Sequence, residues 1–297
     1  MPIYNIILNS SNVVGTTKSN YQYNFINGNF DIYDDASMTV SQIVLPYSWF
    51  NLNTSSYNNT LFSFKWDNLT NYTFTFPDGY YSITDIQNYI EQFCIINSLY
   101  KIDTITGNYV YYIYIYSNPT YYSNQILLYT IDSVAQTNFT YPIGFPFSSN
   151  GYCPSINFLS SSNFNAIIGF SYGSYPTISQ TSNQSFLSNI TPNITPVNGI
   201  VLRCNIVNNE CSPQSDILDT FNINTSFGSN IYYNPSYEKW INIKAGSYSK
   251  LYIYFQDQNL NNITFNDSNI LISLLIKQGK TRYTINKQIK TIKSLEI

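Results

Sequence analysis

Short runs in which apolar and polar residues alternate are the feature of this 297-residue chain that most restricts its fold. Residues 21–25 read Tyr-Gln-Tyr-Asn-Phe, and similar alternation recurs over residues 61–66 and 72–76. Successive side chains of a β-strand point to opposite faces, so this period of two is typical of strands with one buried face. The 30 Tyr and 19 Phe of the chain strengthen the prediction, because aromatic side chains pack well on a pleated sheet.

Residues 37–45 predict a strand with one irregularity. Met38 and Val40 keep the period of two, whereas Ile43 and Leu45 follow it out of phase. A β-bulge would return all four side chains to one face. Pro46 ends the strand, since proline cannot donate a hydrogen bond within a sheet. Further strands are predicted over residues 109–116, 126–130, 165–170, 200–207, 217–223, 240–243, 251–255 and 270–276.

One segment predicts a helix, over residues 83–97. Ser82 and Asp85 have the spacing of a capping box, in which each side chain satisfies a backbone N–H group at the start of a helix. An apolar stripe at helical spacing follows, formed by Ile86, Tyr89, Ile90 and Phe93. Such a stripe is typical of a helix that packs one face against a core.

The number and spacing of these elements predict an all-β fold, a single jelly-roll sandwich with one short helix and an inserted β-rich subdomain. Residues 1–98 and 199–279 are assigned to a discontinuous jelly-roll domain. Residues 99–198, which are interrupted by prolines, are assigned to an insertion domain. Residues 280–297 are assigned to a basic C-terminal arm.

Basic residues gather in that last segment. Six of the 13 Lys and Arg residues fall within residues 277–297, where Glu296 is the only acid, although the whole chain carries a net charge of −3. This asymmetry predicts contacts with an assembly partner or a nucleic acid. The residues expected to make them are Lys280, Arg282, Lys287, Lys290 and Lys293. A solvated tail is the alternative. An arm on a partner subunit is favoured over contact with packaged DNA, because isoleucines lie between the cations.

The residue types needed for metal binding are largely absent. The chain has no histidine, and its four cysteines form no C-x-x-C pair, so we expect neither a metal nor a cofactor. Cys204 and Cys211 flank the turn predicted at Asn208-Asn209 and would be the candidates for pairing. Four free thiols are the preferred interpretation.

Catalysis also has few candidates. Without histidine, serine and cysteine nucleophiles lack their usual base. Asp34 and Asp35 are adjacent, and Asp216 and Asp219 are close in sequence, but glycosidases place two carboxyl groups across a cleft. Turn formation explains such acids equally well. We therefore expect that the protein is not an enzyme. No apolar stretch approaches the roughly 20 residues of a membrane span.

A chain with 18% aromatic and only 10% charged residues predicts extensive contacts with other protein surfaces. Tyrosine is enriched at protein interfaces, since it offers a large ring and a hydroxyl group. A monomer with so few charges would be prone to self-association. Stacking of the rings on sugars is the alternative use.

Four stretches resemble a known family. Residues 41–52 (Ser-Gln-Ile-Val-Leu-Pro-Tyr-Ser-Trp-Phe-Asn-Leu), residues 76–81 (Phe-Pro-Asp-Gly-Tyr-Tyr) leading into the predicted helix, and the closing strands 251–257 and 270–276 resemble the penton proteins of virophages and Polinton-like viruses. These are minor capsid proteins. The resemblance covers residues 20–98 and 200–277 and excludes the middle segment and the basic tail.

The resemblance implies a structural capsid protein that forms homopentamers at the vertices of an icosahedral double-stranded DNA virus particle. It implies trimers of a double-jelly-roll major capsid protein as partners, and a location in the virion after assembly in the host cell. The insertion domain would project outward at the vertex. A viral receptor- or glycan-binding jelly-roll module is the alternative, which exposed rings on the loops of residues 120–198 would favour.

Overall fold

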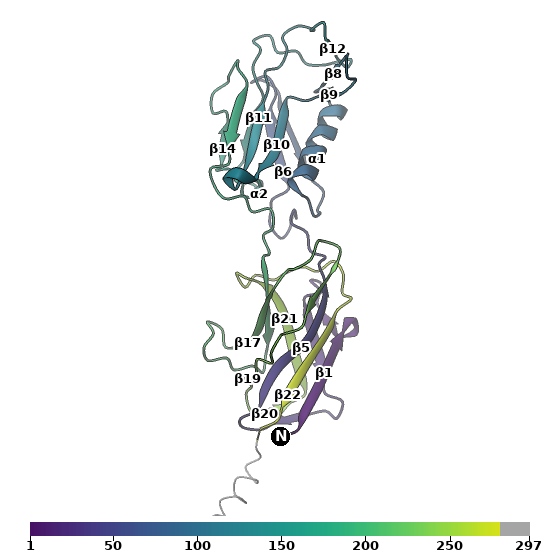
Figure 1. Cartoon of the computed structure of the whole chain (residues 1–297), viewed down its shortest axis with the longest axis vertical. Helices are drawn as coiled ribbons and strands as arrows, with labels where there is room; N and C mark the ends of the chain where they lie inside the picture. Colours follow the sequence, from purple (N-terminus) through teal and green to yellow (C-terminus); the bar gives the residue numbers. More distant parts are fainter. Residues whose placement is uncertain (280–297) are drawn as a thin grey trace, which may run out of the picture. The chain divides into compact units, whose positions relative to one another are not determined.

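The computed structural model describes residues 1–279, and the chain divides into two compact units (Figure 1). Unit 1 consists of Met1–Trp49 and the described residues from Val197 onward, and unit 2 consists of Phe50–Pro196. The boundary predicted between residues 98 and 99 is therefore wrong, because the structure divides the chain between Trp49 and Phe50 instead. The basic residues expected at 280–297 lie outside the described residues.

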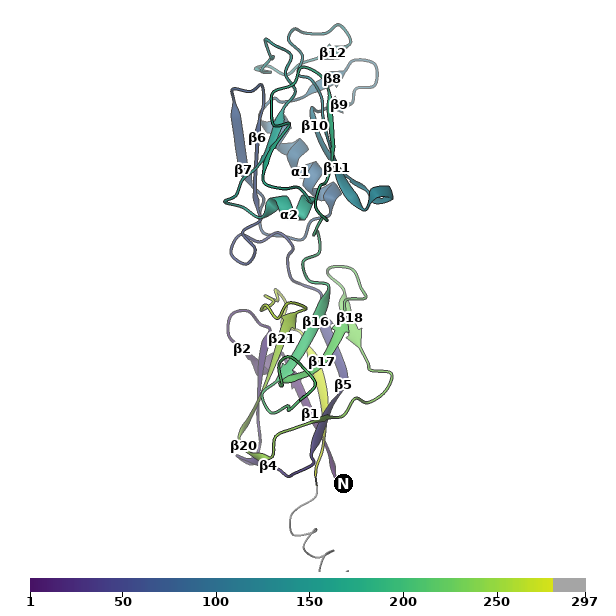
Figure 2. The ribbon, with the colours of Figure 1, turned by 90° about the vertical axis from the view of Figure 1, so that its left-hand side faces the viewer.

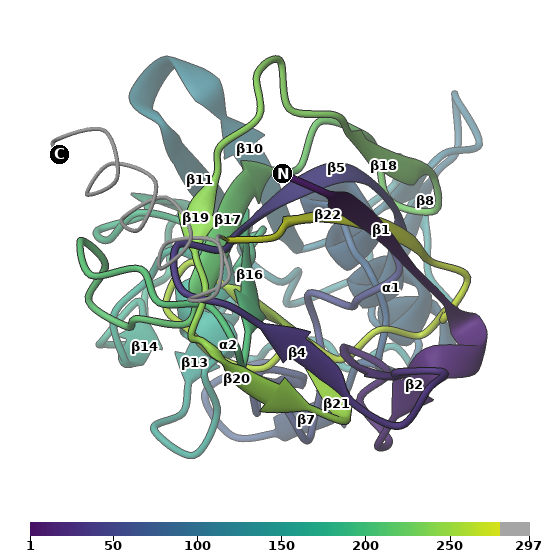
Figure 3. The same ribbon diagram turned by 90° about the horizontal axis from the view of Figure 1, so that it is seen from below.

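Unit 1 contains two antiparallel sheets and a two-stranded ribbon. The first sheet has the order β1 (Ile3–Asn9), β22 (Leu271–Lys277), β5 (Ser37–Pro46) and β18 (Asn230–Tyr233), and β19 (Ile241–Asn242) also pairs with β5. The second has the order β17 (Ile217–Asn222), β16 (Gly199–Cys204), β21 (Lys250–Asp257), β3 (Asn20–Asn24) and β2 (Val13–Val14). The ribbon pairs β4 (Phe30–Ile32) with β20 (Gly246–Tyr248), which lie side by side in Figure 3. A 3₁₀ turn, η1 (Ser10–Asn12), follows β1.

The order of the strands in the two sheets is that of a jelly roll. Successive long strands alternate between the first and second sheets, except that β16 and β17 are neighbours in the second. In chain order, these strands are β1, β3, β5, β16, β17, β18, β21 and β22. Two sheets built in this way are the jelly-roll solution to packing eight antiparallel strands. The predicted all-β jelly-roll fold is confirmed. Unit 2 is inserted in the connection between β5 and β16.

The irregular strand predicted over residues 37–45 contains the expected bulge. Gln42 of β5 lies opposite Ser273, whereas Val40 lies opposite Leu274, so one residue of β5 has no counterpart on β22. This extra residue brings Val40 and Ile43 to the same inward face, and both are buried. On the neighbouring strands β3 and β21 of the second sheet, the Tyr21 ring meets the Phe255 ring edge to face, with ring centres 5.8 Å apart.

Unit 2 contains three small sheets. The first has the order β14 (Gly173–Tyr175), β13 (Ser155–Phe158), β6 (Leu61–Lys65) and β7 (Asn71–Thr75). The second has the order β10 (Ile113–Asn118), β11 (Ser123–Leu128) and β15 (Gln184–Leu187). The third has the order β12 (Phe139–Thr140), β8 (Lys101–Asp103) and β9 (Tyr109–Val110). Figure 2 shows the predicted hairpin of β6 and β7. Because β6 also pairs with β13, this hairpin belongs to unit 2, which is why the predicted boundary fails.

The helices of unit 2 are α1 (Ile83–Ile96), α2 (Phe164–Ile168) and the 3₁₀ turn η2 (Pro119–Tyr121). The capping box predicted for α1 is present, and Ile86 and Ile90 are buried. The predicted strand over residues 165–170 is wrong, since α2 occupies most of it. Within residues 1–279, no helix combines the length and apolar character needed to cross a membrane.

Helix α1 covers the β10 edge of the β10–β11–β15 sheet in unit 2. The side-chain amide of Gln87 donates to the carbonyl oxygen of Ile113 at 3.2 Å and accepts from the backbone N–H of Ile115 at 2.8 Å. The amide therefore occupies the place that the peptide group of a neighbouring strand would take. This arrangement blocks the free edge of β10, which would otherwise offer unpaired backbone groups to another chain.

Candidate binding site

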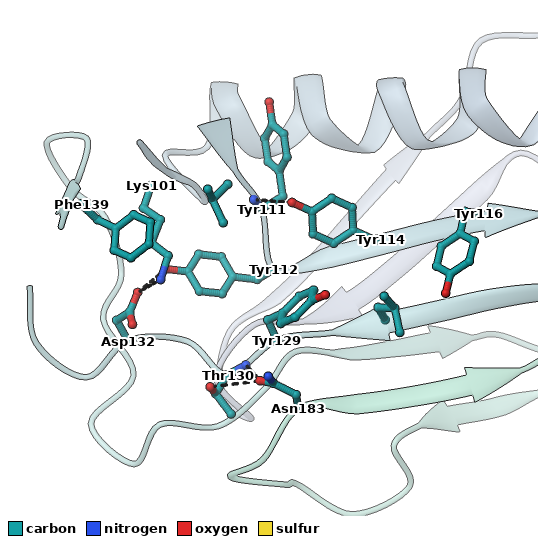
Figure 4. Close-up of a pocket in the computed structure, with 12 residues that line it drawn as sticks. Lys101, Tyr111, Tyr112, Tyr114, Tyr116, Tyr129, Thr130, Asp132, Phe139 and Asn183 are labelled. Carbon is teal, nitrogen blue, oxygen red and sulfur yellow. Dashed lines mark hydrogen bonds and ion pairs between the residues drawn. The ribbon is translucent and has the colours of Figure 1, made fainter. Parts of the chain in front are cut away.

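Unit 2 holds a cavity of about 560 Å³ beside the exposed face of β10 and β11 (Figure 4). Its walls come from five segments that are separate in sequence: β8, the β9–β10 region, β11 with the loop after it, β12, and the loop before β15. Ligand pockets typically have volumes of roughly 300–1,000 Å³ and combine many apolar groups with a few polar ones. The cavity meets both conditions.

Tyr114 and Tyr116 of the cavity face outward because aliphatic residues occupy the inward positions of β10. On β10, Ile113 and Ile115 are buried, so the alternate residues Tyr114 and Tyr116 lie on the opposite face. Leu127 of β11 lies opposite Tyr114 in the antiparallel register. The result is an outward sheet face on which Tyr114 and Tyr116 lie opposite Leu127 and Gln125.

Two of these rings are open to solvent. Tyr116 is 38% exposed and Tyr129, which follows β11, is 39% exposed. Tyr129 meets the Tyr114 ring edge to face at a centre distance of 5.8 Å. The Tyr114 hydroxyl accepts from the backbone N–H of Tyr111 at 3.1 Å, which fixes that ring in place. Tyr129 thus packs against a ring that is held in place.

A carboxylate anchors one end of the cavity. Oδ2 of Asp132 accepts from Nζ of Lys101 at 2.8 Å, from the Tyr112 hydroxyl at 2.7 Å and from the Tyr141 hydroxyl at 2.9 Å. The Lys101 ammonium also lies 4.0 Å from the centre of the Phe139 ring. Five side chains from β8, β12 and three loops therefore converge on one ion pair.

These contacts set the ionisation of the group. Burial raises the pKa of Asp132, but the hydrogen bonds from Lys101, Tyr112 and Tyr141 outweigh it, so this pKa lies below its usual value. Burial and the bond to Asp132 raise the pKa of Tyr141 to about 12 and raise that of Tyr112 as well. At neutral pH the carboxyl is charged and both phenols keep their protons.

Another polar group of the cavity is Asn183, whose side-chain oxygen is held by Thr130. Oδ1 of Asn183 accepts from the backbone N–H of Thr130 at 2.9 Å and from the Thr130 hydroxyl at 3.3 Å. Its Nδ2 donates no hydrogen bond to any other residue within 1–279. The amide nitrogen is therefore left for a ligand or water.

Two of the carboxylates considered for catalysis, Asp216 and Asp219, have structural partners. Arg203 holds Asp216 with two hydrogen bonds, of 3.0 and 2.7 Å. Asp219 accepts from Lys239 at 3.0 Å and from the Tyr233 hydroxyl at 2.6 Å. These pairs stabilise the loop and strands around β17.

The cysteines are free thiols throughout the described part of the chain, and Cys94, Cys153 and Cys204 are buried while Cys211 is exposed. Burial raises the pKa of Cys94 and Cys204 to about 12, so both stay protonated. No group of three or more potential metal ligands occurs among residues 1–279.

No local sequence pattern predicts the whole cavity. The alternation within residues 112–116 predicts a strand, and it places Tyr114 and Tyr116 on one face of that strand. That face was the only sequence indication of the site. Lys101, Asp132 and Asn183 line the cavity through contacts between segments that are distant in sequence, and local sequence patterns do not predict such contacts.

The topology of unit 1 defines a jelly-roll protein with a second compact unit inserted in one connection. No protein-family model matches the chain, and no curated protein matches it. Among solved structures, it is similar to the crystal structure of the selenomethionine-labelled mavirus penton protein, with a TM-score of 0.39 and 11% sequence identity over 94% of this chain and 100% of that chain. The similarity is distant, and membership of the penton family stays a prediction.

Proposed function

We propose that the protein is a structural capsid protein whose unit 1 assembles into homopentamers at the vertices of an icosahedral double-stranded DNA virus particle. The observation that carries the proposal is the outward face of the β1–β22–β5–β18 sheet. The proposed neighbours in the shell are trimers of a double-jelly-roll major capsid protein, and the proposed location is the virion.

That outward face carries apolar side chains on all four strands, beside uncharged polar residues such as Asn5, Gln42 and Ser273. Tyr232, Val44 and Leu271 lie directly opposite one another in register, on β18, β5 and β22. On β1, Ile3 is 56% exposed and Ile7 is 52% exposed. Facing residues of paired strands lie on the same side of the sheet, so these side chains form one surface.

The same face carries little charge. Among the described residues of these four strands, Lys277 at the end of β22 is the only charged side chain. A sheet face with exposed apolar side chains and few charges is typical of protein–protein contacts. In a closed ring, each subunit presents this face to a different surface of the next copy, which gives a heterologous interface.

Replacing Ile7 by lysine should weaken self-association at least tenfold, because a charge would be buried at the interface. Sedimentation velocity over a range of concentrations measures the effect, and electron microscopy of the unmodified protein should show rings with five-fold symmetry. Ile26→Lys is the matched control, since Ile26 is 91% exposed in the loop before β4 and outside this face. A protein that stays monomeric, or an Ile7→Lys variant that assembles normally, would contradict the proposal.

We also propose that the basic segment 280–297 is an assembly arm. A chain that ends at Gly279 should keep the circular dichroism spectrum of the full chain and lose assembly into particles. A full-length variant with glutamine at Lys280, Arg282, Lys287, Lys290 and Lys293 separates charge from length. If this variant fails only in salt-sensitive DNA binding, the segment contacts packaged DNA instead. Normal particles from the truncated chain would refute the arm.

A further inference from the structure

We propose that the cavity of unit 2 binds a neutral oligosaccharide on the rings of Tyr116 and Tyr129. This inference goes beyond the assembly role of unit 1 and is independent of it, since every residue used lies in unit 2. It follows from the shape of the cavity, its hydrogen-bonding groups and its charge.

The rings provide flat, accessible surfaces. Tyr116 and Tyr129 are each more than a third exposed, at 38% and 39%, and project from the sheet face toward the cavity (Figure 4). The C–H groups on one side of a pyranose ring pack against an aromatic face, while its hydroxyl groups point to the edges. A tyrosine offers both the apolar face and a polar tip.

Hydrogen-bonding groups stand at the edges of these rings. The hydroxyls of Tyr116 and Tyr129 make no hydrogen bond with another described residue of the chain. Neither does Nδ2 of Asn183, whose oxygen is already occupied by Thr130. Hydroxyl groups and amides are neutral donors and acceptors, which match the hydroxyl groups of a sugar.

The charges around the cavity exclude an anionic ligand. Lys101 and Asp132 are its only charged lining residues, and they neutralise each other at 2.8 Å. Unit 2 as a whole has two basic residues, Lys65 and Lys101, against six acidic ones, so its field is negative. A sialylated or sulfated sugar would meet this field without a free cation to compensate it.

A peptide is also disfavoured. Extended peptides commonly bind by adding a strand to a free sheet edge. The edge of β10 beside the tyrosines is occupied by the Gln87 amide, which bonds to Ile113 and Ile115. A ligand that recognises side-chain rings and needs no backbone pairing fits the site better.

The test uses the full chain on a printed array of neutral, sialylated and sulfated oligosaccharides, followed by calorimetric titration of the strongest neutral sugar. Tyr116→Ala and Tyr129→Ala should each weaken binding at least tenfold, whereas Tyr116→Phe should lose only a small part of the affinity. Tyr121→Ala is the control, because Tyr121 is 66% exposed on η2 and does not line the cavity.

Hydroxyl-radical footprinting of the unmodified protein gives a readout that does not depend on how the variants fold. Bound sugar should protect Tyr116 and Tyr129 and leave Tyr121 unprotected. Binding to anionic sugars alone, binding to no neutral sugar, unchanged affinity in both alanine variants, or protection elsewhere on the chain would each overturn the proposal.

Discussion

Replacing Trp66 by alanine is expected to lower the free energy of unfolding of unit 2 by about 3–5 kcal/mol, the usual cost of removing a large aromatic side chain from a core. The Trp66 side chain is fully buried. It meets the ring of Tyr112 at a centre distance of 5.2 Å and that of Phe145 at 6.1 Å. Its indole N–H donates to the carbonyl oxygen of Pro146 at 2.8 Å. The variant loses the packing and leaves this carbonyl group without its donor.

Hydrogen exchange followed by mass spectrometry measures the loss in each unit separately. Peptides from β6 and β10 should exchange faster in the Trp66→Ala variant, while peptides from β21 and β22 keep their rates. Phe255→Ala is the matched control, since Phe255 is fully buried in the core of unit 1, and it should give the reverse pattern. If both variants accelerate exchange everywhere, the two units do not have separate stabilities.

Replacing Asp132 by alanine should destabilise unit 2 by about 3 kcal/mol, because it leaves a partly buried ammonium and two hydroxyl groups without their shared acceptor. The Lys101 side chain is only 13% exposed and that of Asp132 only 15%. Urea unfolding followed by circular dichroism measures the difference. Asp31→Ala, which removes an exposed carboxylate of unit 1, should leave the midpoint of unfolding unchanged. A stability loss as small as that of Asp31→Ala would contradict the assigned role.

The same carboxylate makes the stability of unit 2 depend on pH. The pKa of Asp132 is lower in the folded protein than in the unfolded chain, so its contribution is present above the unfolded value of about 3.9. The contribution is lost as the pH falls through the lower folded value. The unmodified protein should therefore lose stability below about pH 4 more steeply than Asp132→Ala. Parallel curves for the two proteins would exclude this linkage.

The features predicted well from the sequence depend on residues that are close along the chain. The capping box of Ser82 and Asp85 and the stripe that follows it fix α1 within one segment. The bulge in β5 was visible because Val40 and Ile43 had to share a buried face. Strand β1 was not predicted, because Ile3 and Ile7 are apolar although they face outward. They interrupt the alternation of apolar and polar residues by which the other strands were predicted.

The wrong predictions concern choices that local patterns leave open. The sequence of the β6–β7 hairpin is compatible with a place in either unit. Only the pairing of β6 with β13 assigns the hairpin to unit 2. The apolar run within residues 165–170 fits a buried strand or a short helix, because periodicity cannot separate them at this length. The cavity likewise requires Lys101, Asp132 and Asn183 to meet from distant segments.

The insertion of unit 2 between β5 and β16 determines the order in which the chain becomes able to fold during translation. All of unit 2 leaves the ribosome before β16, whereas β1 and β5 need β22 as their neighbour and β3 needs β21. The nascent chain therefore carries a completed unit 2 while the first jelly-roll strands stay unpaired and open to aggregation. A ribosome that stalls late in translation would release a chain with a folded unit 2 and unpaired, aggregation-prone strands of unit 1. Uninterrupted elongation therefore protects this protein from aggregation.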